Sequence, residues 1–193
     1  MPRIDSEKFY TSAIERHGVS PKGVNWLSKQ SQHIRFDIIL ALLPKGLDSF
    51  TLVDAGCGFG DFYLYMQKKK RLPKEYIGVD SLLDMYSIAS EQTGCEILLA
   101  DICTEPIPRA DYYICSGAMN VLQEFETHLF IQNCYKASTI AFIFNILHGD
   151  KESPTYNYLT LEKIQSIAKE LGVKKVIFKD SYLKNDITVG FFK

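Results

Sequence analysis

The stretch Thr51-Leu-Val-Asp-Ala-Gly-Cys-Gly-Phe-Gly-Asp-Phe62 decides the fold of this chain. Its first residues are mostly apolar, as in a buried strand, and its last residues open a segment with the apolar spacing of a helix. Between them lie three glycines, which permit a tight turn and a close approach of the backbone to a ligand: Gly56, Gly58 and Gly60. A strand, a glycine-rich turn and a helix in this order predict a loop that binds a nucleotide-type ligand.

The spacing of the glycines discriminates between ligands. A dinucleotide-binding loop requires its third glycine one position later, where this chain has Asp61. The carboxylate of Asp61 would repel a pyrophosphate, so the spacing disfavours an NAD-linked oxidoreductase. The order Asp-x-Gly-x-Gly-x-Gly, beginning at Asp54, resembles motif I of class I S-adenosylmethionine-dependent methyltransferases. This resemblance implies that Asp54, Ala55 and the three glycines contact S-adenosylmethionine.

Composition bounds the class of protein. The chain has 193 residues, of which 46% are hydrophobic, enough for one core and a modest extension. A formal net charge of -1 provides no field for a polyanion, and the basic run Lys68-Lys-Lys-Arg71 is typical of a solvated helix end. We therefore expect no nucleic-acid partner.

The cysteines and the hydropathy indicate a soluble, cytoplasmic protein. Five cysteines without a Cys-x-x-Cys pair are typical of reduced core thiols, so neither a disulfide framework nor a metal site is expected. The N-terminus lacks the apolar segment of a signal peptide, and the longest apolar run is too short to span a bilayer. No membrane association is expected, and the oligomeric state is left open.

The rest of the chain alternates between two periodicities. Helices are expected over 6–17 and 28–43, before the glycine loop, and over 62–70, 82–93, 127–137 and 161–171 after it. Apolar runs predict strands over 50–55, 76–80, 96–100, 112–116, 140–146, 176–182 and 187–192. Only residues 184–186 separate the last two strands, which is too short for a crossover helix and predicts a hairpin.

These elements predict an α/β fold: a Rossmann-like, seven-stranded, mostly parallel sheet with a C-terminal antiparallel hairpin and helices on both faces. A sheet whose last strand is reversed also resembles the class I methyltransferases. Residues 1–46 are expected to form an N-terminal helical extension, or lid, and residues 47–193 the methyltransferase domain.

Acidic residues at the ends of the next strands extend the resemblance. Asp80 ends the second strand at the distance from the loop where a carboxylate binds ribose hydroxyls, with helix capping as its other role. Asp101 ends the third strand and, in the methyltransferase pattern, meets the adenine amino group with Ile102 against the ring. A turn residue is the alternative for Asp101. The further cofactor contacts that the pattern implies are Ser81, Met85, Ser116 and Gly117.

The flanking segments resemble a narrower group, the small bacterial class I methyltransferases without an assigned substrate. Residues 17–26, 31–36 and 144–147 carry this resemblance. It implies that the N-terminal segment folds over the cofactor as a lid. On that segment, Arg35 is a candidate clamp for the methionine carboxylate, because a guanidinium makes two parallel hydrogen bonds to a carboxylate. A solvated arginine is the alternative.

Candidate catalytic residues follow the fourth and fifth strands. Asn120 and His148 are both expected near the transferred methyl group, with His148 as the general base if a hydroxyl acceptor must lose its proton. A loop or capping role is the alternative for His148. Trp26, Tyr156 and Tyr158 are candidate acceptor-binding aromatics, and partial core packing is the alternative for the two tyrosines.

Missing motifs narrow the acceptor. The fourth strand is not followed by the Asp/Asn-Pro-Pro-aromatic motif of exocyclic-amine methylation, and no proline precedes Cys115 as cytosine C5 methylation would require. The sequence therefore favours methyl transfer to an oxygen or nitrogen of a small molecule. The alternative from another class is a catalytically silent S-adenosylmethionine-binding module that serves a protein partner.

Overall fold

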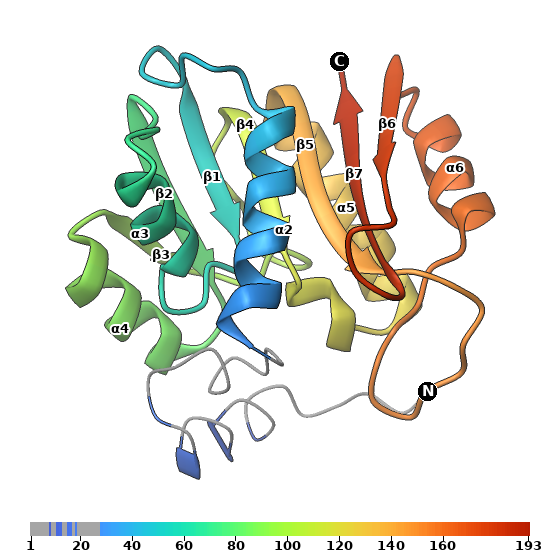
Figure 1. The fold of residues 1–193 in the computed structure, drawn as a ribbon, viewed down its shortest axis with the longest axis horizontal. Helices are drawn as coiled ribbons and strands as arrows, with labels where there is room; N and C mark the ends of the chain where they lie inside the picture. Colours follow the sequence, from blue (N-terminus) through green and yellow to red (C-terminus); the bar gives the residue numbers. More distant parts are fainter. Residues whose placement is uncertain (1–7, 9–10, 13–14, 17, 19–27) are drawn as a thin grey trace.

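The protein is a three-layered α/β structure around one mixed sheet (Figure 1). The computed structural model describes residues 8, 11, 12, 15, 16, 18 and 28–193. In this part of the chain the strands follow the order β3-β2-β1-β4-β5-β7-β6. Their bounds are β1 Thr51–Ala55, β2 Glu75–Asp80, β3 Glu96–Leu99, β4 Ala110–Ser116, β5 Ser138–Leu147, β6 Lys175–Lys179 and β7 Asp186–Phe192.

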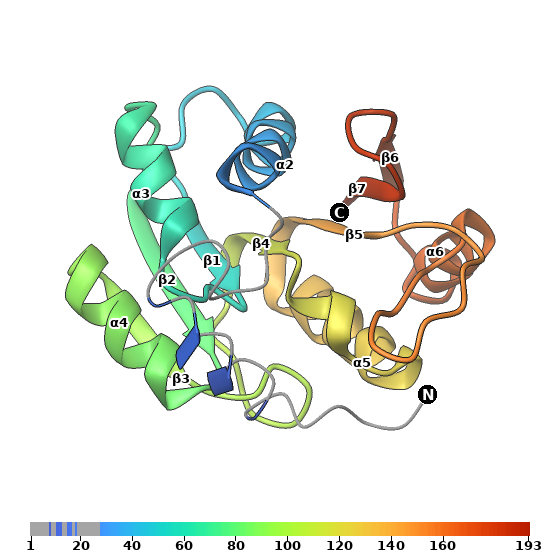
Figure 2. The ribbon, with the colours of Figure 1, turned by 60° about the horizontal axis from the view of Figure 1, so that its bottom comes forward.

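Strands β1 to β5 pair in parallel, whereas β7 runs antiparallel to both β5 and β6. The helices are α2 Lys29–Leu42, α3 Asp61–Lys68, α4 Leu83–Thr93, α5 Glu124–Ala137 and α6 Leu161–Glu170, with the short 3-10 helix η2 Ala118–Val121. Helices α2 and α3 lie on one face of the sheet, and α5 and α6 lie on the other (Figure 2). Helix α4 packs beside β2 and β3.

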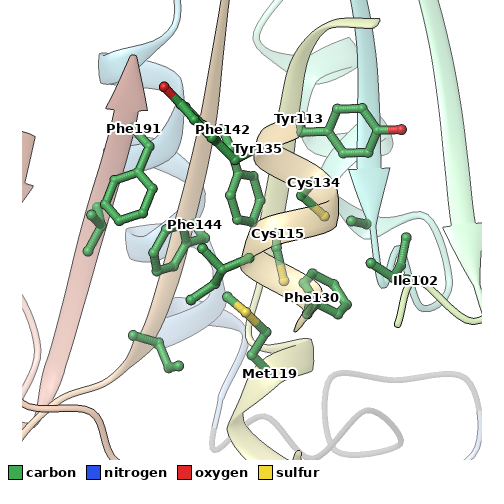
Figure 3. Packing of buried hydrophobic residues seen from close by; sticks show 14 of the residues in the cluster. Ile102, Tyr113, Cys115, Met119, Phe130, Cys134, Tyr135, Phe142, Phe144 and Phe191 are labelled. Carbon is green, nitrogen blue, oxygen red and sulfur yellow. The ribbon is translucent and has the colours of Figure 1, made fainter. Parts of the chain in front are cut away.

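Two hydrophobic clusters hold the layers together, one on each face of the sheet. On the α5 side, aromatic side chains of the strands meet the buried face of that helix (Figure 3). The rings of Phe142 and Phe144 stack with their centroids 4.9 Å apart, and Phe191 contacts Phe144 edge to face. Cys115 is buried in this cluster, in agreement with a packing role for the thiol.

The predicted fold class is confirmed, including the hairpin at the C-terminus. All seven strands lie within two or three residues of their expected bounds, because each is an apolar run ended by turn residues. Helix η2 was missed, since four residues carry no helical periodicity. Most of the helix expected over 6–17, and Trp26, lie outside the described residues.

Helix α2 packs directly on the sheet. Its residues Phe36, Ile39 and Leu40 belong to the same cluster as Leu52 of β1 and Ile143 of β5. Residues 29–42 of the extension or lid predicted over 1–46 therefore contribute to the core, and most of residues 1–27 lie outside the described part of the chain. No described helix is both long and apolar enough to cross a membrane.

The basic run after α3 has a structural role in part. The guanidinium of Arg71 donates hydrogen bonds to the carbonyl oxygens of Leu40 (3.0 Å) and Pro44 (2.7 Å), and so satisfies acceptors at the C-terminal end of α2. Lys69 forms an exposed ion pair with Asp37. These contacts agree with a helix-end role for the run.

Candidate ligand-binding site

The glycine loop after β1 is bound to the end of β2 by three hydrogen bonds. The N–H groups of Gly56 and Cys57 donate to the carbonyl of Val79 (2.8 and 3.0 Å). The N–H of Gly58 donates to Oδ2 of Asp80 (2.9 Å), whose Oδ1 accepts from the N–H of Leu82 (3.1 Å). Asp80 thus fixes the loop to the start of α4, at the point where the strand order reverses between β1 and β4.

Gly56 allows the loop after β1 to lie closer to η2 than any residue with a side chain would permit. Its φ is +76°, and a Cβ built on it would lie 2.3 Å from the Cβ of Ala118 in η2. The backbone of the loop after β1 therefore packs against the side chain of Ala118 in η2. This contact forms one wall of a cleft at the carboxyl ends of the parallel strands, the edge where open α/β sheets bind ligands.

A cavity of about 1200 Å³, its open mouth included, occupies this cleft. Four aspartates line it, and no lysine, arginine or histidine is among its described lining residues. Its walls also include apolar side chains from several elements. The lining includes Gln32, Phe36, Asp54, Gly56, Gly58, Asp61, Phe62, Asp80, Ser81, Met85, Asp101, Ile102, Ser116, Gly117, Asn120, Leu122, Phe130 and Tyr156.

Burial changes the ionisation of two of these aspartates. Burial raises the pKa of Asp54 to about 7, and the nearby charges of Asp80 and Asp61 act in the same direction. The hydroxyl of Tyr76 donates a hydrogen bond to Asp54 (2.7 Å), which opposes part of the rise. Burial also raises the pKa of Asp80, against the backbone N–H groups that bind its carboxylate. Burial thus disfavours the ionised form of both carboxyls in the ligand-free protein, and a cationic ligand beside them would favour their ionisation.

The end of the cavity beside β4 is polar. Ser116 ends the strand and donates its hydroxyl hydrogen to Oδ1 of Asn145 on β5 (3.1 Å). Gly117 follows with a φ of +86° and turns the chain into η2, which carries Asn120. The side chain of Asn120 bridges to β5 by accepting a hydrogen bond from the N–H of Leu147 (3.0 Å).

The cavity brings together most of the residues predicted for the site. Ten of the predicted cofactor residues line it: Asp54, Gly56, Gly58, Asp80, Ser81, Met85, Asp101, Ile102, Ser116 and Gly117. Asn120 and Tyr156, predicted for catalysis and for acceptor binding, line it as well. Ala55 and Gly60 do not. Gly60 has a φ of +81° and lies where a Cβ would be 2.4 Å from Thr93, so it allows α3 to approach α4.

Arg35, a predicted cofactor residue, is paired within the protein. It lies on α2, is not among the residues that line the cavity, and its guanidinium is paired with the carboxylate of Asp186 on β7. The two side chains are 11% and 1% exposed. Asp186 also accepts a hydrogen bond from the hydroxyl of Tyr182 (2.6 Å). This buried network joins α2 to β7 of the sheet.

His148 and Tyr158 also lie outside the cavity. The Nδ1 atom of His148 is 2.9 Å from the carbonyl oxygen of Leu159, and its backbone N–H donates to Asn185. These contacts place the imidazole in the junction between β5 and the following loop. The ring of Tyr158 lies 5.7 Å from the ammonium of Lys151, in a neighbouring surface groove.

Several lining residues were not predicted from the sequence. Gln32 and Phe36 of α2 and Phe62 of α3 reach the cavity from one face, and Leu122 and Phe130 reach it from the other. Gln32 donates a hydrogen bond to Oδ2 of Asp61 (2.9 Å), which joins α2 to the start of α3 at the cavity. In the sequence Phe36, Phe62 and Phe130 fit the apolar positions of helices, and no local motif marks Gln32 or Leu122.

Comparison with known proteins identifies the fold. No protein-family model matches the chain, and no curated protein does. Among solved structures, magnesium protoporphyrin IX methyltransferase from Synechocystis PCC 6803 with bound SAH aligns with a TM-score of 0.68 at 12% identity, covering 84% of this chain and 83% of that one.

Two further structures support the same assignment. A methyltransferase dependent on S-adenosylmethionine from Mesorhizobium loti aligns with a TM-score of 0.64 at 14% identity, covering 83% of this chain and 98% of that one. Human N-acetylserotonin methyltransferase in complex with SAM aligns with a TM-score of 0.71 at 14% identity, covering 98% of this chain and 60% of that one. The chain thus has the Rossmann-like fold of the S-adenosylmethionine-dependent methyltransferases.

Proposed function

We propose that this protein binds S-adenosylmethionine in the cavity beside the glycine loop and transfers its methyl group to a small molecule. The observation that carries the proposal is the charge of the cavity, which four aspartates line without a described cationic side chain. S-adenosylmethionine carries a sulfonium and an ammonium, whereas a dinucleotide carries a pyrophosphate that these carboxylates would repel. The solved structures of the same fold with SAM or SAH support this choice of ligand.

Three parts of the proposed ligand have residues suited to them: the ribose, the adenine and the ammonium. The carboxylate of Asp80 would bind the ribose hydroxyls, since its oxygens keep free lone pairs beyond the two backbone N–H groups that they accept. Asp101 and Ile102 would bind the adenine, with Met85 and Phe130 as apolar walls. Asp54 would face the ammonium. The backbone of Gly56 and Gly58 leaves room for a close approach.

The proposed reaction is an in-line displacement. The bound donor supplies a methyl group on a positively charged sulfur. The chain's residues would exclude water and hold the acceptor near Ser116, Gly117 and Asn120, and such positioning supplies about 7–11 kcal/mol of the rate enhancement. A lone pair of the acceptor oxygen or nitrogen forms the new bond to carbon while the carbon–sulfur electron pair returns to sulfur, and the proton of an O–H or N–H acceptor is released to solvent.

The silent binding module is the second candidate. Leu83, at the start of α4, and Leu99, at the end of the edge strand β3, are 62% and 47% exposed, and exposed apolar side chains suit a protein partner. The candidates differ in turnover. Formation of S-adenosylhomocysteine in a metabolite mixture, above the rate without metabolites, supports the enzyme, whereas binding of S-adenosylmethionine without turnover supports the module.

Isothermal titration with S-adenosylmethionine tests the proposed site. Asp80→Ala removes the ribose contact, and the loss of two charge-assisted hydrogen bonds at about 1.5–3 kcal/mol each is expected to weaken binding at least tenfold. Asp84→Ala, an exposed aspartate in the first turn of α4, is the matched control and is expected to leave the affinity unchanged. A loss below threefold for Asp80→Ala would remove Asp80 from the ribose.

A further inference from the structure

A single hydrogen bond determines the orientation of the Asn120 side chain. Its Oδ1 accepts a hydrogen bond from the backbone N–H of Leu147 (3.0 Å). Because a backbone N–H can only donate, the amide nitrogen must lie on the other side of the carboxamide, away from β5. That Nδ2 has no hydrogen-bond partner among the described residues, and Asn120 lines the cavity. Asn120 therefore offers the cavity a neutral donor and no base.

The same residue holds the loop that follows β5. The carbonyl oxygen of Asn120 accepts a hydrogen bond from the N–H of Asn157 (2.7 Å). The side chain of Asn157 is buried and donates to the hydroxyl of Thr127 on α5 (2.9 Å). These two bonds fix Tyr156, the neighbour of Asn157, beside the polar end of the cavity.

Tyr156 separates the cavity from a second depression. It lines both the cavity and a groove between the N-terminal half of α5, the loop over residues 149–160 and α6. Phe125 and Leu129 of α5 contribute apolar surface to this groove and are 60% and 37% exposed. A molecule that reaches Asn120 past Tyr156 therefore has an apolar surface on which its remaining part can lie.

The groove carries an excess of negative charge. Glu124 is paired with Lys163 (2.8 Å), and His128 lies 3.1 Å from Glu170. The other charged side chains of the groove are Asp150, Glu152 and Lys151, two acids against one base. Together with the four aspartates of the cavity, this charge disfavours an anionic molecule at either end.

We propose that the methyl acceptor is an uncharged or cationic, largely apolar molecule with an uncharged oxygen function, held by Asn120 and Tyr156. Nδ2 of Asn120 donates a hydrogen bond to that oxygen, the acceptor packs against the ring of Tyr156, and its apolar part extends into the groove. The inference rests on the proposed function, because it places the acceptor beside the bound donor. It adds the chemical class of the acceptor, which the fold does not determine.

Three probes that share a phenyl ring test the proposed class of methyl acceptor: acetophenone, benzoate and benzylamine. Binding is measured by saturation-transfer NMR and titration on the full chain saturated with S-adenosylhomocysteine. Acetophenone, with a neutral carbonyl oxygen, is expected to bind, and benzoate at least tenfold more weakly. Benzylamine lacks the oxygen and is expected to bind more weakly than acetophenone. Failure of all three probes to bind, or a preference for benzoate or benzylamine, would overturn the inference.

Two pairs of variants separate recognition from folding. Asn120→Asp keeps an oxygen for the N–H of Leu147 but replaces the donor with an anion, so acetophenone binding should fall about tenfold. Tyr156→Ala should also lower it, and Tyr156→Phe, which keeps the ring, should restore it. Unchanged acetophenone binding in Asn120→Asp or Tyr156→Ala would overturn the inference even where the other variant fails to fold.

The titration with S-adenosylhomocysteine distinguishes failure of the proposed function from failure of the acceptor class. Absence of heat with S-adenosylhomocysteine contradicts the proposed function itself. Normal affinity for S-adenosylhomocysteine, combined with the wrong order of probes, contradicts only the acceptor class. Circular dichroism of each variant confirms that a lost signal reflects a lost contact.

Discussion

Gly56 is the residue at which the site depends most directly on backbone conformation. Its φ of +76° is costly for an L-residue, and an added Cβ would meet the Cβ of Ala118 at 2.3 Å. We expect Gly56→Ala to push η2 away from the loop, to lower the melting temperature and to weaken S-adenosylmethionine binding more than tenfold. Thermal unfolding and calorimetric titration measure the two effects.

Gly94 provides the matched control for this substitution. It also has a positive φ, +66°, but no atom lies within 4 Å of an added Cβ. Gly94→Ala should therefore lower the free energy of unfolding only by the cost of a left-handed backbone conformation, about 1–2 kcal/mol, and leave ligand affinity unchanged. Equal effects of the two substitutions would show that the contact with Ala118 does not shape the site.

At the scale of single residues, the spacing of residues along the chain predicted those parts of the site that neighbouring stretches of sequence form. Gly58 and Asp80 could be predicted because a glycine loop and the following strand end have a regular separation in chains of this fold. The pairing of Arg35 with Asp186 joins residues 151 positions apart, and nothing in the local sequence encodes it. The sequence therefore offered Arg35 only as a guanidinium on the N-terminal segment, a candidate clamp for a carboxylate.

At the scale of elements, one ion pair anchors α2 to the sheet. Arg35 and Asp186 are almost fully buried, so removing the cation leaves a buried carboxylate without its partner. We expect Arg35→Met to lower the free energy of unfolding by about 3–5 kcal/mol. Urea denaturation measures this loss. Affinity for S-adenosylmethionine should change less than twofold, because Arg35 does not line the cavity.

The exposed pair between Lys69 and Asp37 serves as the control on the same helix. Its side chains are 46% and 53% exposed, so Lys69→Met should cost about 0–1 kcal/mol. A stable Arg35→Met variant that loses tenfold in affinity would instead support the clamp that the sequence suggested. The experiment thus separates an anchor from a ligand contact.

The elements themselves were more predictable than their contacts. Strands β4 and β5 are long apolar runs, and the short connection before β7 leaves only a hairpin. Helix η2 was not predictable, because its four residues, among them Asn120, follow a turn set by Gly117. The inward faces of α2 and α3 were visible as apolar stripes, but which of their residues reach the cavity depends on how the helices pack.

At the scale of the whole molecule, buried carboxyl groups connect stability to pH. The pKa of Asp54 is raised from 3.8 to about 7 by burial, and burial also raises the pKa of Asp80 and Asp186. Between pH 4 and 7 the folded chain keeps a proton on Asp54 that the unfolded chain releases. The free energy of unfolding of the ligand-free protein therefore decreases as pH rises through this interval. His33, whose pKa is lowered by burial, acts in the opposite direction.

Asp54→Asn isolates the contribution of this one group, because an amide does not titrate but can still accept the hydrogen bond from Tyr76. We expect the variant to gain stability relative to the wild type as pH rises from 4 to 8, by on the order of a few kcal/mol. Melting temperatures across that range measure the difference, and a constant difference would contradict it. The ionised carboxylate that destabilises the empty protein is also the proposed partner of the ligand's ammonium. S-adenosylmethionine should therefore stabilise the wild type more at pH 8 than at pH 5, and this increase should be absent in Asp54→Asn.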